Sequence, residues 1–204
     1  MYPFFEGFSL GICLIAAIGA QNLFILRQGL LRQHVFMVTS LTALCDFFMI
    51  GIGTMGIGSA FANIPWLRMT VVIGGILFLG YYAFKSFSNA MKGNPNLFIT
   101  DVDPIKNRNT LILNTLAFSL LNPHAILDTV VIIGGFSSQF ANITERSLFA
   151  IGAGSSSIAW FFPLAYGAQF LIPIFRKPIF ARYLDTAIGF IMCFIIYSLI
   201  KSEL

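Results

Sequence analysis

The chain has 204 residues, of which 57% are hydrophobic and only 10% are charged. A soluble domain carries about 25% charged residues, so this chain has too few polar side chains to cover a globule in water. The composition excludes an ordinary soluble protein and predicts that most of the surface faces lipid. The net charge of +4 then reports orientation in a membrane, and no nucleic-acid partner is expected.

Six apolar stretches follow one another along the chain. Most of them approach or exceed the ~20 residues that a helix needs to cross a bilayer, and they lack the polar–apolar alternation of membrane barrel strands. The sequence therefore predicts an all-α integral membrane protein, a single membrane domain over residues 1–204. The six expected transmembrane helices are 8–26, 35–62, 69–84, 110–136, 148–175 and 183–200.

A polar segment, residues 85–109, separates the first three apolar stretches from the last three. We predict that it is a linker between two three-helix repeats, 1–84 and 110–204. Arg68 and Gly75 recur as Arg182 and Gly189, both at a spacing of 114. Because each repeat has three helices, the second copy is inverted in the membrane, an architecture typical of secondary transporters.

The basic residues predict an orientation. Nine lie in the first loop, the linker and the last loop: Arg27, Arg32, Lys85, Lys92, Lys106, Arg108, Arg176, Lys177 and Arg182. The opposite side has Arg68, Arg146 and Lys201. The positive-inside rule places the linker in the cytoplasm and both termini outside, in a bacterial inner membrane.

The first helix of each repeat is expected to be broken. The interruptions are the run from Gly19 to Asn22 and the run from Leu121 to His124, where a proline removes a backbone donor. Paired interruptions at corresponding positions point to the substrate site of a transporter. The residues predicted to bind substrate at the breaks are Gly19, Gln21, Asn22, Asn122, Pro123 and His124.

Two aspartates lie inside apolar stretches. Asp46 is the only charge of the second stretch, and Asp128 lies in the fourth, four residues after His124. A carboxylate at membrane depth costs several kcal/mol unless it is paired or hydrated, so it predicts a function. For Asp185, near Arg182 in the last stretch, we instead expect an acid that stabilises a helix N-terminus.

Paired acids hold a cation or protons, whereas the N-terminal amides of broken helices bind an anion such as a carboxylate. A site with both features suits a basic amino acid. Asp46 and Asp128 are the candidates for binding the substrate cation and protons. No nucleotide motif is present and no cofactor is expected. Proton antiport, with the two three-helix halves rocking in alternating access, is the expected mechanism.

The chain resembles the LysE family of basic amino acid exporters along nearly its whole length. The motifs are residues 19–22, 26–29, Cys45-Asp46, 121–129, Gly134-Gly135, Gln139 and 157–161. This resemblance implies export of lysine or arginine. The chain departs from the family at Ala20, where proline is usual, and at Ile126, where tyrosine is usual.

Two other functions remain open. A divalent metal exporter could use Cys45, Asp46, His124 and Asp128 as ligands, although this set is thin for a hard cation. An intramembrane enzyme could pair a serine of the run 155–157 with His124, but serines in membrane helices usually mediate packing. The three cysteines form no C-x-x-C motif and support neither a disulfide framework nor a zinc site. Glycines between residues 51 and 58 permit close helix packing, within one chain or in a homo-oligomer.

Overall fold

The computed structural model describes residues 2–16, 19–32, 34–57, 65–92, 108–171 and 178–203. All regular elements in these ranges are helices, as the sequence predicts. In the first half of the chain they are α1 (Tyr2–Ile15), α2 (Ala20–Leu31), α3 (Val35–Ile52), η1 (Gly53–Ile57) and α5 (Pro65–Lys92). In the second half they are α6 (Arg108–Leu120), α7 (Pro123–Ile126), η3 (Leu127–Ile133), α8 (Gly134–Ser137), α9 (Ile143–Gly167), η4 (Ala168–Leu171) and α11 (Pro178–Glu203).

The helix boundaries follow local signals. Proline is the first residue of α5, α7 and α11, a position where its missing N–H costs no hydrogen bond. Asn142 caps α9 by accepting a hydrogen bond from the Thr144 amide at 3.0 Å. Gly56 has a φ of 87°, a left-handed conformation that ends the helix and that glycine adopts without strain.

Membrane-spanning potential is clearest in two helices. Within the described residues, Val35–Gly56 and Ile143–Phe170 are long and apolar enough to cross a bilayer, and the bent pair α1 and α2 counts as a third if it is one span. The expected linker starts later than predicted, because α5 continues through Lys85 to Lys92. The reason is packing: Ser86 is buried, and Phe87 contacts Phe190 of α11 edge to face. Residues 93–107 of the expected linker lie outside the described residues.

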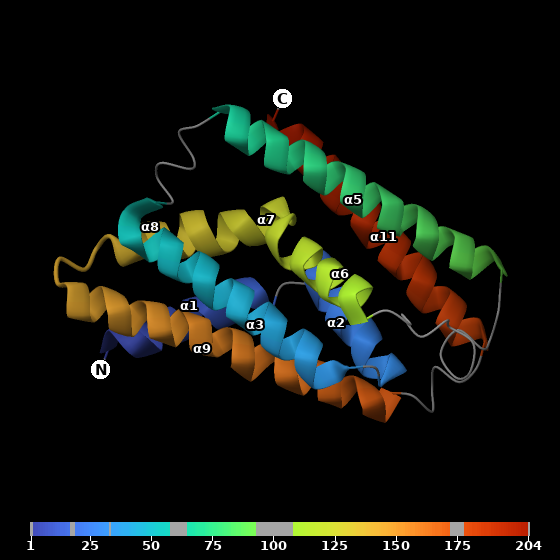
Figure 1. Ribbon diagram of the computed structural model, residues 1–204, viewed down its shortest axis with the longest axis horizontal. Helices are drawn as coiled ribbons and strands as arrows, with labels where there is room; N and C mark the ends of the chain where they lie inside the picture. Colours follow the sequence, from blue (N-terminus) through green and yellow to red (C-terminus); the bar gives the residue numbers. More distant parts are fainter. Residues whose placement is uncertain are drawn as a thin grey trace.

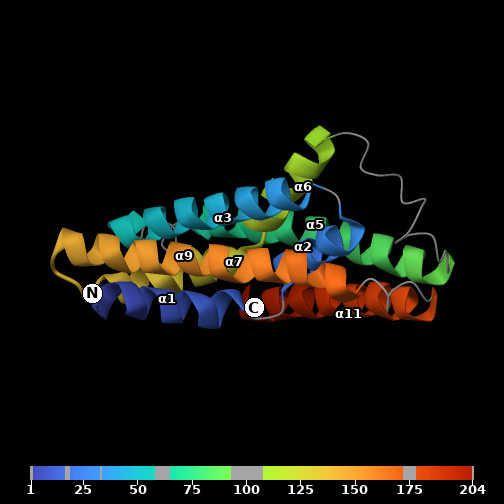
Figure 2. The same ribbon diagram turned by 90° about the horizontal axis from the view of Figure 1, so that it is seen from below.

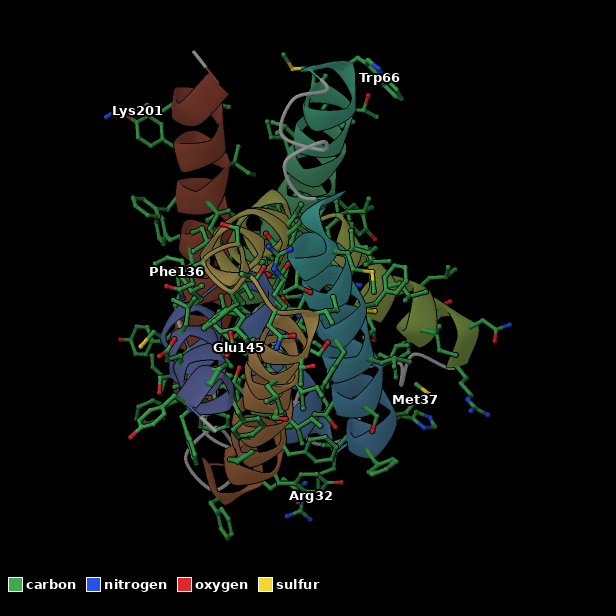
Figure 3. All side chains as sticks on the ribbon, turned by 90° about the vertical axis from the view of Figure 1, so that its left-hand side faces the viewer. Arg32, Met37, Trp66, Phe136, Glu145 and Lys201 are labelled. Carbon is green, nitrogen blue, oxygen red and sulfur yellow. The ribbon has the colours of Figure 1, made fainter. Side chains whose placement is uncertain are left out.

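The helices pack in a long bundle (Figures 1 and 2). α1 and α3 both lie against α9, while α5 and α11 lie side by side. Figure 3 shows Trp66, at the start of α5, and Lys201, near the end of α11, both at the top of the view. Figure 1 likewise shows the C-terminus close to the start of α5, so these two side-by-side helices are antiparallel.

The buried apolar residues form two principal clusters along α3. One contains Val38 and surrounds Phe118 of α6, whose ring stacks on Phe24 of α2 at 4.6 Å. The other joins Ile50 to Ile133 and Phe149. Asp46 lies between Val38 and Ile50 in the sequence of α3, so a buried carboxylate separates the two apolar clusters.

Candidate functional site

The first break lies between Ile15, where α1 ends, and Ala20, where α2 begins. Of the predicted run, Gly19 lies in the break, whereas the residues from Ala20 to Asn22 form the first turn of α2. Gly19 is extended, with φ −134° and ψ 177°, and the helices on either side are bent by 80°. The first backbone hydrogen bond after the break runs from the Leu23 amide to the Gly19 carbonyl at 3.1 Å. α2 therefore begins at Ala20 and presents a positive helix N-terminus at this break.

The second helix break lies at Leu121 and Asn122, the first two residues of the predicted run, whereas Pro123 and His124 begin the next helix. The helix resumes at Pro123, and the Ile126 amide donates to the Asn122 carbonyl at 3.1 Å. It then widens into the π-helical η3, which carries Asp128. Such turns are frequent at functional sites. The side chains of Pro123 and His124 lie outside what the structure describes.

Asp46 is the most enclosed acid of the predicted site, with 2% of its surface exposed. Its two carboxylate oxygens accept from different helices. Gln21 Nε2 of α2 donates to Oδ1 at 3.3 Å, and Ser157 Oγ of α9 donates to Oδ2 at 2.9 Å. Neutral donors thus satisfy a carboxylate that would otherwise be costly to bury.

A cavity of about 40 Å³ joins the two breaks. Six of the eight predicted site residues line it: Gly19, Gln21, Asn22, Asp46, Asn122 and Asp128. The other lining residues are Leu14, Ile15, Ala125, Thr129 and Phe161. The fold therefore brings together two helix N-termini and two aspartates that lie far apart in the sequence.

A chain of hydrogen bonds crosses the first break. Asn22 Nδ2 donates to the Ile15 carbonyl, at the end of α1, at 2.8 Å. Trp160 Nε1 of α9 donates to Asn22 Oδ1 at 3.1 Å. The Ile15 carbonyl is one of the acceptors that a helix end leaves without an intrahelical partner, and Asn22 satisfies it from across the break.

The second break contains a buried acceptor. Asn122 is 5% exposed, and no described group donates a hydrogen bond to its Oδ1. Thr129, which also lines the cavity, donates its hydroxyl to the Ala125 carbonyl at 2.6 Å. Asn122 therefore brings to the second break a buried amide oxygen that accepts from no described group.

Ser157 and Trp160 are residues whose role at this site the sequence analysis did not foresee. Both are on α9, three residues apart, and so on one face of the helix. The sequence signal that could have pointed to them is the presence of a serine and a tryptophan inside a long apolar helix. Their partners could not be deduced, because Asp46 is 111 residues from Ser157.

The arrangement gives little support to the two alternative functions. Cys45 is buried but does not line the cavity, and the described residues contain no group of three acids, histidines or cysteines placed for a metal ion. Ser155 and Ser156 donate to carbonyls of their own helix, Ile151 and Ala153. Ser157 donates to Asp46 at 2.9 Å, and the side chain of His124 lies outside the described residues.

Asp185 does not stabilise a helix N-terminus, contrary to our expectation. Because α11 begins at Pro178, Asp185 lies two turns inside the helix and is 2% exposed. Its Oδ1 lies 4.0 Å from Arg27 Nη2 of α2. The pair ties the far end of the first broken helix to α11, and it does not line the cavity.

Comparison with known proteins identifies a family and several relatives. The model of the LysE type translocator family matches residues 12–202. A protein named YggA from Aeromonas salmonicida is 37% identical over 187 residues, which is 92% of this chain and 90% of that protein. Two proteins named "Arginine exporter protein ArgO", from Enterobacter sp. (strain 638) and Salmonella typhimurium, are each 36% identical over 199 residues, 98% of this chain and 93% of theirs.

No solved structure matches the chain. The family match covers far more than half of the sequence and includes both helix breaks and both aspartates of the cavity. Translocators move molecules and do not transform them, so the chain is a transporter and not an enzyme. The chain belongs to the LysE type translocator family.

Proposed function

We propose that this protein is a secondary active exporter of basic L-amino acids, arginine or lysine, across a bacterial inner membrane. The observation that carries the proposal is the position of Asp46. It is a buried carboxylate in the wall of a cavity, and its hydrogen bonds come from the neutral groups of Gln21 and Ser157. A buried acid without a cation in contact is well suited to bind a cation that comes and goes.

Arginine fits the complementary groups around the cavity. Its guanidinium presents five N–H donors in a planar fork that matches carboxylates, and Asp46 and Asp128 both line the wall. Its α-carboxylate suits the helix N-termini that begin at Ala20 and Pro123. Asn122 Oδ1 is an acceptor for the α-ammonium. The arginine exporters among the relatives favour arginine as substrate.

Export also requires a driving force. Moving one positive charge outward against an inside-negative potential costs ~2.3 kcal/mol per 100 mV. Exchange of one proton inward for one basic amino acid outward is electroneutral and removes this cost. Asp46 and Asp128 are the proposed proton carriers: the ionised carboxylates bind the substrate, and the protonated forms release it.

The size of the cavity supports alternating access. About 40 Å³ holds about three water molecules, which is far too little for an amino acid. The apolar clusters around Phe118 and around Ile50 lie on either side of Asp46 along the sequence of α3. Substrate therefore enters after the helices separate toward one side of the membrane, and it leaves after they separate toward the other.

The proposed topology is six transmembrane helices in two inverted repeats. Exchanging α1 and α2 with α6 to α8, α3 with α9, and α5 with α11 reproduces the pattern of neighbours: α1 lies against α9 as α6 lies against α3, and α2 touches α11 as α7 touches α5. α5 and α11 are each about 40 Å long at 1.5 Å per residue, enough to cross. The excess of basic residues places the linker in the cytoplasm and both termini outside.

Growth on canavanine, a toxic arginine analogue, tests the function. In a strain without its own exporters, the native protein is expected to confer resistance. Asp46→Asn and Asp128→Asn should each lose it, because removing one charged hydrogen bond of about 3 kcal/mol lowers transport about 100-fold. Glu145→Gln is the matched control, since Glu145 is an exposed acid at the start of α9.

Purified protein in liposomes tests the coupling. Counterflow of labelled arginine with an imposed proton gradient is expected to be at least several times faster than without one. Equal rates would overturn proton antiport. If cells with confirmed membrane expression of the native protein stay sensitive to canavanine, arginine is excluded as the substrate. Transport of labelled lysine is then measured in the same liposomes.

A further inference from the structure

The helices around the cavity form two groups in space, and these groups differ from the two halves of the sequence. α1 and α2, from the first half of the chain, lie against α9 of the second half. α6, η3 and α8, from the second half, lie against α3 and η1 of the first. We name these groups body A (α1, α2 and α9) and body B (α3, η1 and α6 to α8). Each body therefore contains helices from both halves.

Body A is joined by contacts between backbones. A Cβ atom added at Gly7 of α1 would meet the backbone of Phe149 in α9, and one added at Gly152 would meet the backbone of Phe4. Gly29 of α2 approaches the Ala165 carbonyl in the same way. Small residues at such points let helices in a membrane approach closely. The hydrogen bond from Trp160 to Asn22 adds a polar link within this body.

Body B is joined by the same kind of contact. A Cβ atom at Gly134 of α8 would meet the backbone of Gly53 in η1, and one at Gly53 would meet the backbone of Val130 in η3. Backbone contacts of this kind leave no soft side chain to absorb sliding, since packed interiors are stiff. Each body is therefore expected to move as a unit.

The boundary between the bodies is extensive, because α3 of body B lies along α9 of body A and α2 touches α3 and α6. Two contacts on it are made by aromatic side chains. Gly154 of α9 faces the ring of Phe47 in α3, not its backbone, and Phe24 of α2 stacks on Phe118 of α6 at 4.6 Å. Aromatic side chains can change rotamer and partner while the backbones stay intact, so these contacts can be remade when the bodies move.

The cavity lies on this boundary. Body A contributes Leu14, Ile15, Gly19, Gln21, Asn22 and Phe161, and body B contributes Asp46, Asn122, Ala125, Asp128 and Thr129. Both hydrogen bonds of Asp46 cross the boundary, because Gln21 and Ser157 belong to body A. Asp46 is therefore held by the opposite body while the cavity is closed.

We infer that Ser157 is a positioning residue for Asp46, and that Ser157 and Gln21 together form a latch, a pair of hydrogen bonds that holds body A to body B. The two bodies move relative to each other, and each combines the broken helix of one half of the chain with the second helix of the other half. This inference rests on the proposed alternating access and replaces the rocking of the two sequence halves. Substrate guanidinium takes over the oxygens of Asp46 from Gln21 and Ser157. The latch then opens, and the two bodies separate around the ligand.

Spin-label distances discriminate between the two divisions. In protein whose native cysteines, Cys13, Cys45 and Cys193, are replaced by alanine, labels are placed at pairs of exposed positions. Phe5 and Ile151 lie in different halves but in one body, whereas Phe5 and Phe48 lie in one half but in different bodies. Phe48 and Leu113 provide the equivalent same-body pair for body B. Distances are measured in liposomes without any amino acid, in the native background and with Ser157→Ala.

The expected result is a longer and broader Phe5–Phe48 distribution in Ser157→Ala, with both same-body pairs unchanged. Ser157→Thr, which keeps the hydroxyl, should restore the native distribution. A changed Phe5–Ile151 distance with a constant Phe5–Phe48 distance would show that the two sequence halves move against each other. Unchanged distances in all three pairs would contradict the role of Ser157 as a latch. Arginine export by the cysteine-free protein is measured separately. Its absence would overturn the proposed function and leave these substrate-free distances valid.

Discussion

The two helix breaks occupy corresponding places in the chain but are built differently. At the first, Asn22 and Trp160 tie the end of α1 to the start of α2 and to α9 through two hydrogen bonds. At the second, the chain turns through Leu121 and Asn122, resumes at Pro123 and widens into a π-helical stretch. There, Asn122 Oδ1 is buried without a donor among the described groups.

In the proposed substrate site, this difference separates two tasks. Hydrogen bonds of Asn22 at the first break fix the direction of the helix N-terminus and do not involve Asp46. At the second break, no described group donates to Asn122 Oδ1, a state that costs stability unless a ligand or water supplies the hydrogen bond. We therefore propose that the first break is the preorganised wall of the cavity, and that the second is the wall that gains most from a bound ligand.

The largest effect is expected at the ion pair between Arg27 and Asp185, which joins α2, the helix after the first break, to α11. Arg27→Leu leaves Asp185 buried without its cation, so the free energy of unfolding in detergent is expected to fall by about 3 kcal/mol. The double variant Arg27→Leu with Asp185→Leu should recover most of this loss, because an apolar pair replaces a buried ion pair at little cost. A full loss in the double variant would show that α2 is not held by this pair.

Alanine substitutions at the two asparagines sharpen the contrast between the breaks. Asn22→Ala leaves the Ile15 carbonyl and the Trp160 indole without partners and should lower the free energy of unfolding by about 2 kcal/mol. Asn122→Ala removes an oxygen that accepts nothing from the described groups, so stability should change little while the KM for arginine export rises several-fold. Equal destabilisation by both variants would contradict the division of tasks. Unfolding and efflux are measured on the same preparations.

The smallest effect is expected at Trp160. Trp160→Phe keeps an aromatic ring against α2 but removes the donor to Asn22, which should cost about 1 kcal/mol of stability. Trp66→Phe is the matched control, because Trp66 is 70% exposed at the start of α5. Thermal unfolding followed by circular dichroism measures both variants. If Trp66→Phe lowers the stability more than Trp160→Phe does, the loss of the Trp160–Asn22 hydrogen bond is not the cause of the destabilisation.

The local features of this fold were predictable from the sequence. Pro123 marks the second break because it lacks a backbone donor, and Asp46 and Asp128 are conspicuous because charge is costly inside apolar helices. Both appear in the cavity wall. The later start of the linker was not predictable, because the last turns of α5 depend on contacts with α11, including that of Phe87 with Phe190.

The partners of these residues required the structure. Periodicity and composition describe one segment at a time, whereas Asp46 with Ser157 and Arg27 with Asp185 join residues more than 100 positions apart. The assignment of Asp185 failed for this reason: Arg182 is its neighbour in sequence, but α2 supplies its cation. The pairing of α1 with α9 likewise follows from glycines on both helices, whose match becomes visible only when the helices meet.

The small volume of the cavity has a consequence for hydration. A space for about three waters must grow to hold an amino acid, and each added water occupies about 30 Å³ of liquid. In the proposed alternating access, this growth draws water into the protein. Solutes that are too large to enter the cavity lower the water activity outside it and oppose the growth, so the proposed cycle is coupled to the water activity of the solution on the side toward which the protein opens.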